Sequence, residues 1–402
     1  MTLLTTTAAL LLGLSAAGLI LWGVLLFRLS RMLVGRPTVR EGLRLPAPQG
    51  GWPRLSIVVP VHDEGAVIDG CARLLRGQEY DDLEIIFVLD RCTDGTARIL
   101  ARHAEEDGRV ILIESDSCPP DWAGKCHAAD LGAKRATGDW ILFTDADTRF
   151  DPRLCRASMA LAGARGLVLL SLLSTLTYAH LFERVAQIAA GINLLMLYPI
   201  HRLNRAKPPR PFANGQFMLF RRDWYDRVGG HAAVKDALLE DIAAAKLVRE
   251  HGGAGGVAFA DGMLMCSMYD TLAEFESGWK RIYIEACDRR PARLRKWGRR
   301  TLAYGVGLPL LQLGALATAP VVWPHGGAAL ALALAGTVLG GWAVQAAVLY
   351  RIHMLAQAPR RSIPLHPVGC FIVGRILLRG ARDLESGRPL VWGRREYVLE
   401  PR

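Results

Sequence analysis

The sequence has no closely spaced pair of cysteines. Its eight cysteines are scattered over 402 residues, and none forms a C-x-x-C motif. This absence excludes the usual structural zinc sites and the disulfide frameworks of small secreted proteins. We therefore expect reduced cysteines in a domain that faces the cytosol.

Charged residues are absent from Thr2 to Phe27. A run of this length can cross a bilayer, which requires about 20 apolar residues. Its positive charge follows the run, whereas a cleaved signal peptide begins with positive charge and ends at a small-residue cleavage site. Residues 1–30 are therefore predicted to be a retained transmembrane anchor with its N-terminus outside and its basic flank in the cytoplasm. A cleaved signal is the alternative.

A second region, from residue 301 to residue 350, contains no Asp, Glu, Lys or Arg. A turn-like sequence, Pro324-His325-Gly326-Gly327, divides it into halves that are each long enough to span. Basic residues flank both ends of this predicted hairpin and none lies in its turn, so both ends are expected in the cytoplasm. Residues 351–402 then form a cytoplasmic or interfacial tail of a protein that is integral to the cell (inner) membrane.

Basic residues gather beside these apolar runs and explain much of the net charge of +11. Juxtamembrane Lys and Arg attract anionic lipid by about 1 kcal/mol each. Nucleic-acid binding would instead require basic and aromatic residues interleaved in a soluble domain. We therefore expect the membrane bilayer, and no nucleic acid, as the partner of this charge. The largest cluster comprises Arg289, Arg290, Arg293, Arg295, Lys296, Arg299 and Arg300.

Residues 50–295 alternate between strand-like and helix-like patterns. Short apolar runs typical of buried parallel strands are separated by helical patterns, which gives the order βαβαβαβ. That order is typical of an α/β domain in which helices cover a parallel sheet. The predicted strands are Leu55–Val61, Leu83–Leu89, Val110–Ile113 and Trp140–Phe143.

Acidic residues follow three of these strands. Ligands of open α/β sheets bind beyond the carboxyl ends of the strands. One carboxylate there caps the next helix equally well, but capping does not explain the pair Asp145 and Asp147. On extended chain the two carboxylates point to the same side, and they suit a cation such as Mg²⁺ or Mn²⁺ that shares oxygen ligands with substrate phosphates. A solvated turn is the alternative.

Six motifs in this order resemble the membrane-associated glycosyltransferases of family 2. They are IVVPVHDEGAVI, FVLDRCTDGT, DWAGKCHA, ILFTDADTRFDP, ANGQFMLF and LLEDIAAAKLV, and the resemblance covers about residues 52–290. The similar members glycosylate carotenoids, hopanoid-associated lipids or ceramide, and the tail GRPLVWGRREY is similar to those of polytopic members. The resemblance implies a GT-A nucleotide-sugar-binding domain, with a mixed, largely parallel sheet flanked by helices. One N-terminal and two C-terminal transmembrane helices accompany it.

The resemblance also implies the residues that bind the donor. Asp63 and Glu64 would contact the nucleoside, and Asp90 the uracil base of a UDP-sugar. Arg91 stands where many relatives have a second acid, so the identity of the nucleotide base stays open. Trp122 and Lys125 would lie against the diphosphate, where a lysine charge is physically sensible, although a solvated lysine at a helix start is the alternative for Lys125.

The acceptor half is implied by the later motifs. Asp241 would be the base that deprotonates the acceptor hydroxyl, with Glu240 as its orienting neighbour; the alternative is an acid pair favoured by a helix dipole. The motif Asn214-Gly215-Gln216 would contact acceptor and donor, because glycine allows close backbone approach. His231, in a predicted turn, is expected at the surface.

Only the tryptophan remains of the Q-x-x-R-W box found in processive and ceramide-type relatives, because the equivalent stretch reads Phe275-Glu276-Ser277-Gly278-Trp279. This departure argues against a processive polymer synthase. Trp279 is then a possible platform for a sugar or lipid ring, or else a tryptophan at the membrane interface.

Residues 166–200 are largely apolar but contain Glu183 and Arg184. The charges disfavour a spanning helix, so we expect a strand over Leu167–Leu173 followed by an amphipathic helix at the membrane interface. A plain buried helix is the alternative.

The expected activity is an inverting sugar transfer from a nucleotide sugar to the hydroxyl of a membrane lipid. Two alternatives stay open. One is a synthase acting on a soluble or polymeric glycan, and the other is a non-catalytic membrane scaffold with the same fold.

Overall fold

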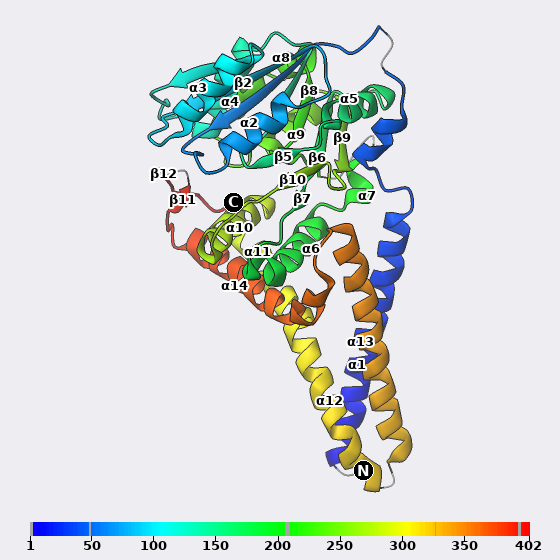
Figure 1. Ribbon diagram of the computed structural model, residues 1–402. Coiled ribbons are helices and arrows are strands. Elements are labelled where there is room, and N and C mark those ends of the chain that lie inside the picture. The colour runs from blue at the N-terminus through cyan, green and yellow to red at the C-terminus, as the bar shows by residue number, and fades with distance from the viewer. Residues whose placement is uncertain (1–2, 48–49, 206–209, 326, 393–394) are drawn as a thin grey trace.

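The computed structural model describes residues 3–47, 50–205, 210–325, 327–392 and 395–402. It consists of an α/β domain and a stalk of three long helices that extends away from it (Figure 1). The stalk contains α1 (Leu3–Leu33), α12 (Leu308–Val322) and α13 (Ala328–Leu355). The N-terminal end of α1 and the α12–α13 connection lie together at the far tip, so both ends of the hairpin face the domain.

The stalk helices pack through small and branched apolar residues. Ala8 of α1, Ala315 and Ala319 of α12, and Leu334 and Val338 of α13 form a buried cluster. Leucines and other large apolar side chains cover its outside. Four helical segments of the described chain are long and apolar enough to cross a membrane by length and composition: Leu3–Leu33, Pro291–Val322, Ala328–Leu355 and Arg360–Glu385. The sequence predicted one N-terminal and two C-terminal spans.

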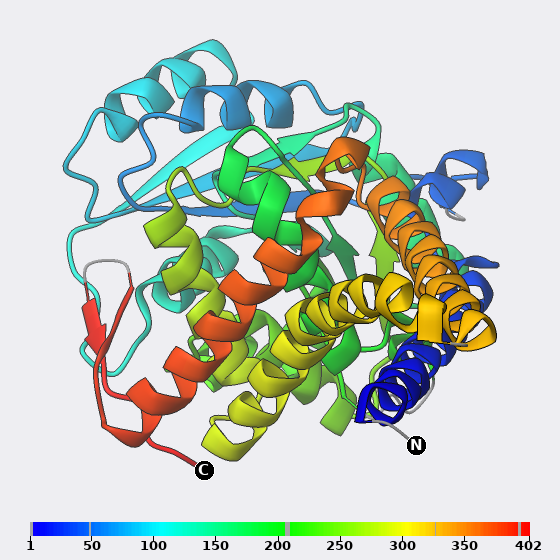
Figure 2. The ribbon, with the colours of Figure 1, turned by 90° about the horizontal axis from the view of Figure 1, so that it is seen from below.

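The additional C-terminal segment contains α14 (His366–Glu385), which follows the 3-10 helix η6 (Arg360–Leu365). It does not join the stalk but crosses the base of the domain beside α11 (Pro291–Leu302) and α10 (Leu272–Ala286), as seen from below (Figure 2). Its apolar residues recur at helical spacing and face the core, while its arginines interrupt the apolar run in the sequence. That interruption is why the sequence indicated only a tail here.

The central sheet is mixed and has the order β3-β2-β1-β4-β8-β6-β9. Its members are β1 (Leu55–Val61), β2 (Leu83–Asp90), β3 (Val110–Ser115), β4 (Trp140–Phe143), β6 (Leu169–Leu173), β8 (Met218–Arg221) and β9 (Gly255–Phe259). The strand β8 runs antiparallel to β4 and β6, and the other pairings are parallel. The α/β fold with a largely parallel sheet is confirmed.

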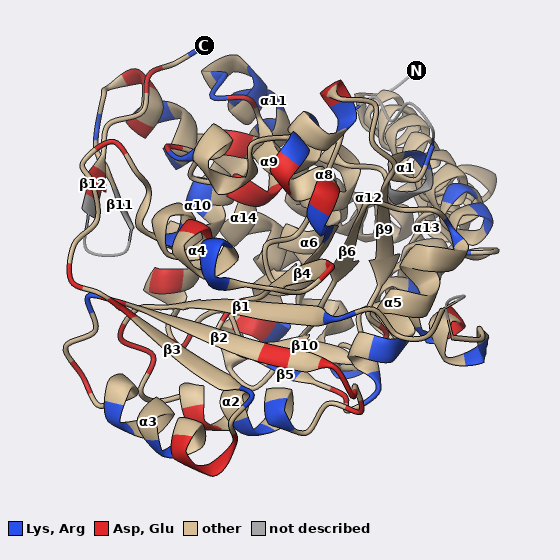
Figure 3. Ribbon diagram, turned by 90° about the horizontal axis from the view of Figure 1, so that it is seen from above, with Lys and Arg blue, Asp and Glu red and all other residues tan. Residues whose placement is uncertain are grey.

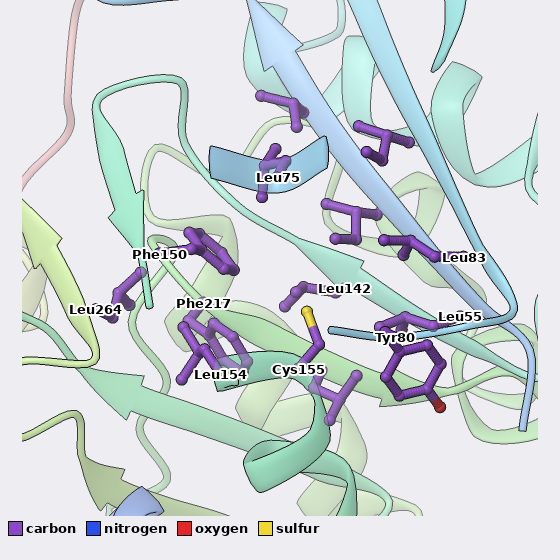
Figure 4. Packing of buried hydrophobic residues seen from close by; sticks show 14 of the residues in the cluster. Leu55, Leu75, Tyr80, Leu83, Leu142, Phe150, Leu154, Cys155, Phe217 and Leu264 are labelled. Atoms are coloured by element: carbon purple, nitrogen blue, oxygen red, sulfur yellow. The ribbon is translucent and has the colours of Figure 1, made fainter. Parts of the chain in front are cut away.

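Helices cover both faces of this sheet (Figure 3). On one face lie α2 (Ile68–Arg76), α3 (Thr96–Glu106) and α5 (Leu154–Ala164), and on the other lie α4 (Gly124–Arg135), α8 (Arg222–Arg227) and α9 (Glu240–Glu250). Because side chains alternate along a strand, Ile57 and Val59 of β1 enter the first core and Val58 enters the second. Figure 4 shows the first core, to which Leu75 of α2, Leu142 of β4 and Leu154 of α5 all belong. Each such buried side chain contributes about 1.5–3 kcal/mol.

A second, three-stranded sheet of β5 (Thr148–Phe150), β10 (Leu264–Cys266) and β7 (Thr175–Leu176) lies beside the carboxyl end of β4. The helix expected after the strand at Leu167–Leu173 is present as the π-helical turn η2 (Glu183–Gln187) and α6 (Ile188–Leu197), which pack against α10 and α14. The remaining elements are η1 (Val39–Arg44), α7 (Ile200–Leu203), η3 (Gly230–Val234), η4 (Ala303–Gly307), η5 (Trp323–His325), β11 (Leu390–Trp392) and β12 (Arg395–Tyr397). Gly393 and Arg394 of the tail motif, and Gly326 of the predicted turn, lie outside the described residues.

Candidate active site

Two adjoining cavities lie at the carboxyl ends of the strands. The polar cavity, of about 300 Å³, is lined by residues at or just after the ends of β1, β2 and β4, including Glu64, Asp90 and Asp147. The apolar cavity, of about 270 Å³, contains Asp241 at its polar end and extends to α6 and α13. Three residues line both cavities: Lys125, Asp145 and Arg281.

The pair Asp145 and Asp147 lies where the sequence placed it, just after β4, and both side chains line the polar cavity. Asp147 accepts a hydrogen bond from Cys266 Sγ at 3.2 Å through Oδ2, while its Oδ1 is buried without a hydrogen-bond partner among the described residues. Burial and the neighbouring charge of Asp145 raise the pKa of Asp147 to about 7. A cation would relieve both the unpartnered oxygen and the like-charge repulsion.

No group of three or more His, Cys, Asp or Glu side chains within the described chain is arranged to hold a metal ion. Asp145 and Asp147 therefore fit a hard cation that takes its remaining ligands from a phosphorylated substrate and from water. Glu64 lies in the same negative field, since burial and the neighbouring charge of Asp145 raise the pKa of its carboxyl to about 7.

The residues expected at the nucleoside divide into two groups. Glu64 and Asp90 line the polar cavity. Asp63 is not among its lining residues, and its carboxylate accepts hydrogen bonds from the backbone amides of Thr93 and Asp94 at 2.7 and 3.3 Å. Asp63 therefore holds the loop after β2 in place. Its own backbone is in the left-handed region, with φ of 55°.

Arg91 engages both carboxylate oxygens of Asp90, at 2.8 Å through Nε and 2.7 Å through Nη2. The sequence showed an arginine at this position but not that it would pair with its neighbour. Tyr397 of β12, near the C-terminus, also lines this cavity. Trp122 is not among the lining residues of either cavity, and its ring packs against that of His127.

Lys125, in the first turn of α4, bridges the two cavities. Its Nζ lies 2.7 Å from Asp145 Oδ1 and 2.7 Å from Glu240 Oε1. These contacts contradict the alternative of a solvated lysine at a helix start. Although burial alone would raise the pKa of Glu240, the ammonium group of Lys125 holds it below its usual value.

Asp241 lies in the first turn of α9 and lines the apolar cavity. Its Oδ2 accepts the backbone N–H of Gly215 at 2.8 Å. Burial and the adjacent charge of Glu240 raise the pKa of Asp241 to about 7. A base is most effective when its pKa lies near the working pH, so this carboxylate is suited to accept a proton.

The motif Asn214-Gly215-Gln216 lines the apolar cavity beside Asp241. A Cβ added at Gly215 would come within 2.9 Å of Lys125 Nζ and 3.1 Å of Glu240 Oε1, so a larger residue would displace these charged groups from the backbone. Asn214 donates to the Leu172 carbonyl at 2.9 Å, and Gln216 donates to Cys266 Sγ at 2.9 Å. The thiol of Cys266 therefore links this motif to Asp147.

Trp279 is 3% exposed, packs against Phe275 and Tyr283, and lines the apolar cavity. It forms part of a buried wall and is not an exposed tryptophan at a membrane interface.

The prediction that His231 lies at the surface is wrong. It is 2% exposed, and its Nδ1 lies 2.8 Å from the hydroxyl of Tyr225. Gly229 and Gly230 adopt positive φ and turn the loop back onto the sheet, where the His231 ring packs against Phe143.

Sequence reasoning missed Cys266 and Arg281. Cys266 reaches the site because β10 pairs with β5 in the register that sets it opposite Thr148, the residue after Asp147. Arg281 follows Trp279 by two residues on α10, and that proximity was the only signal for it.

Comparisons with known proteins agree with this fold. Residues 56–229 match the model of the Glycosyl transferase family 2. The putative glycosyltransferase EpsH of Bacillus subtilis is 30% identical over 111 residues, which is 28% of this chain and 31% of that one. The glycosyltransferase AglD of Haloferax volcanii is 31% identical over 125 residues, 30% of this chain and 19% of that one. The chain thus spans less than a third of the length of these curated relatives.

Among solved structures, the mannosyltransferase PcManGT from Pyrobaculum calidifontis in complex with GDP-Man and Mn²⁺ superposes with a TM-score of 0.50 at 17% identity. The similarity covers 94% of this chain and 98% of that one. Residues 56–229 therefore match the Glycosyl transferase family 2, and the sheet order and the similarity to PcManGT show that the fold is that of a GT-A glycosyltransferase.

Proposed function

We propose that this protein is a membrane-anchored, inverting glycosyltransferase that moves a sugar from a nucleotide sugar, a UDP-sugar, to the hydroxyl of a membrane lipid. The observation that carries the proposal is the apolar cavity. Its polar end holds Asp145 and Asp241, and its other end is lined by Ile352 and Leu355, in the last turns of the stalk helix α13.

The lining of this cavity suits a hydrocarbon chain. The helix α6 contributes Ile188, Ile192 and Leu195, and its opposite face packs into the protein. A soluble sugar acceptor would require polar groups along the cavity to replace its hydrogen bonds with water. An apolar path that leads from a membrane helix to a carboxylate base therefore favours a lipid acceptor over a soluble or polymeric glycan.

The polar cavity is the proposed donor site. The solved structure of similar fold was obtained with GDP-Man and Mn²⁺, and the carboxylates Asp145 and Asp147 fit a divalent cation in this chain. When bound there, Mg²⁺ or Mn²⁺ supplies positive charge to the diphosphate leaving group. Glu64 and Asp90 would hold the nucleoside, and Lys125 would act at the diphosphate.

The proposed reaction is a single displacement. Asp241, held by the Gly215 amide, takes the proton of the lipid hydroxyl, whose oxygen then attacks the anomeric carbon from the face opposite the diphosphate. The bond between that carbon and the phosphate oxygen breaks, and its electron pair leaves with the nucleoside diphosphate. Glu240 keeps Lys125 in place between the two cavities. One displacement inverts the anomeric configuration.

The test is transfer of radiolabel from UDP-sugars into the lipid extract of membranes that contain the protein. We expect label in lipid, and none with Asp241→Asn. Label transferred to a soluble or polymeric glycan would favour the glycan synthase, and nucleotide binding with all label left on the UDP-sugar would favour the scaffold. Lipid mass spectrometry after deletion of the gene identifies the acceptor, and protease accessibility in sealed vesicles tests the cytoplasmic placement of the domain.

A further inference from the structure

Cys266 is a buried residue outside the sequence motifs, and it contacts the proposed cation site. It lies in β10, the middle strand of the three-stranded sheet, opposite Thr148 of β5 on one side and Leu176 of β7 on the other. Its carbonyl oxygen accepts the backbone N–H of Thr177 at 3.0 Å, and the residue is 1% exposed. Because strands on both sides hold the backbone of Cys266, its thiol has a fixed place beside Asp147.

The thiol of Cys266 is the donor in its contact with Asp147. Sγ lies 3.2 Å from Asp147 Oδ2, and an ionised carboxylate only accepts hydrogen bonds. The same Sγ accepts a hydrogen bond from Gln216 Nε2 at 2.9 Å. The amide oxygen of Gln216 is engaged elsewhere, since it accepts hydrogen bonds from Ser174 Oγ and from Asn214 Nδ2. The hydrogen bonds therefore run in one direction, from Gln216 through the thiol to Asp147.

This arrangement leaves the two carboxylate oxygens of Asp147 in different surroundings. Oδ2 accepts the thiol proton, whereas Oδ1 is buried and has no hydrogen-bond partner in the part of the chain that the structure describes. A buried charged oxygen without a partner is costly, and a cation would supply the missing interaction. The thiol also restrains rotation of the carboxylate, so Oδ1 stays the oxygen that is left for a ligand. Hydrogen bonds that hold metal-binding carboxylates in place strengthen metal binding.

We propose that Cys266 is a positioning residue of the cation site, whose thiol fixes Asp147 so that Oδ1 alone is left for a divalent cation. This inference rests on the proposed function for the presence of that cation. Within the described residues, Asp145, Asp147 and Cys266 do not form a three-ligand metal site, so the thiol acts through Asp147 and not as a ligand. Gln216 holds the thiol in turn, so a motif expected at the acceptor also supports the cation site.

Serine and alanine at position 266 separate the hydrogen bond from the packing, because both side chains are smaller than cysteine and only serine donates a proton. Mn²⁺ binding in the presence of UDP is measured by electron paramagnetic resonance on the full-length protein in nanodiscs. We expect Cys266→Ala to weaken Mn²⁺ binding by about tenfold or more, and Cys266→Ser to keep an affinity close to that of the wild type. Uridine binding, measured by calorimetry, should not change in either variant.

The matched control is Cys155→Ala, which removes a buried thiol of the first core on α5. Because Cys155 belongs to the packing of that core and to neither cavity lining, this variant should bind Mn²⁺ as the wild type does.

The S–H stretching band of Cys266 supplies a readout that a change in packing alone would not move. Infrared spectra isolate this band when the spectrum of the matching Cys266→Ser variant is subtracted. Hydrogen bonding lowers the frequency of the band, so Asp147→Ala should shift it to higher frequency. Asp116→Ala, at an exposed position, should leave it in place.

Equal Mn²⁺ affinities in Cys266→Ser and Cys266→Ala would overturn the inference, because the hydrogen bond would then make no difference. An S–H band that Asp147→Ala does not shift would overturn it as well. A wild-type protein that binds UDP but no Mn²⁺ would refute the metal of the proposed function, and the inference with it.

Discussion

The polar and apolar cavities share Lys125, Asp145 and Arg281, yet they are built in different ways. The polar cavity is formed mainly by residues at the carboxyl ends of β2, β1 and β4, which are neighbours in the sheet, so its acids come from one repeated structural position. The apolar cavity is assembled from α6, the loop before β8, α9, α10 and α13, which are distant in the sequence. The proposed donor side is therefore a property of the fold, whereas the proposed acceptor side is a property of how this chain packs its helices.

The largest expected difference between the two cavities comes from removing the proposed catalytic base, Asp241, from the apolar cavity. Asp241→Asn keeps the shape of the side chain and its position near Gly215 but cannot accept a proton. We expect kcat to fall by about 100-fold or more, while UDP affinity stays within twofold. Radiolabel transfer and calorimetry measure the two effects. Glu250→Gln, at the exposed end of the same helix, is the control, and undiminished turnover in Asp241→Asn would remove Asp241 from its role.

The next change acts on the polar cavity alone. Asp147→Ala removes a carboxylate whose raised pKa and unpartnered oxygen indicate a cation site. We expect the affinity for Mn²⁺ in the presence of UDP to drop by about tenfold or more, as followed by the electron paramagnetic resonance of Mn²⁺. Uridine binding should not change. Asp116→Ala, at an exposed position, should behave as wild type, and metal-independent turnover in both variants would exclude the metal site.

The apolar cavity can be narrowed without touching the charged groups. A Cβ added at Gly191 of α6, which lines the cavity, meets no atom within 4 Å. Gly191→Leu should therefore fit the backbone and occupy the space for the lipid chain. We expect KM for the lipid acceptor to rise several-fold, to about tenfold, with UDP binding unchanged. Gly163→Leu makes the same substitution at an exposed helical glycine, and equal KM values in the two variants would argue against a hydrocarbon in this cavity.

The smallest expected effect is a dependence on pH. The pKa of Asp241 is raised to about 7, and only the unprotonated carboxylate can act as base. The rate should therefore fall as pH decreases below about 7, by several-fold between pH 7 and pH 6, and level off above it. Because the folded-state pKa lies above the unfolded one, ionisation of Asp241 destabilises the fold as pH rises toward 7. Reaction rates measured at saturating donor and metal test the predicted loss of activity at low pH. A rate that stays constant from pH 5 to pH 8 would contradict that prediction.

Much of the fold followed from local patterns. The expected bounds of β1 and β4 match the observed ones, since β-branched and apolar runs between turn residues define buried strands. The helix α14 was missed because its arginines break the apolar run, although they lie on one face once the helix forms. His231 was misplaced because the loop that carries it turns inward through two glycines with positive φ.

The candidate site also has features that local sequence predicts and features that depend on tertiary packing. By itself the sequence determined that acids follow β1, β2 and β4, and that Asp145 and Asp147 lie side by side, because strand periodicity and parallel topology are written in short segments. Only the tertiary structure decided that Lys125 lies between Asp145 and Glu240, that Cys266 contacts Asp147, and that Arg281 lies where the two cavities meet. These contacts depend on the packing of segments far apart in the chain, and packing is decided by the shapes of whole elements, which no local pattern contains.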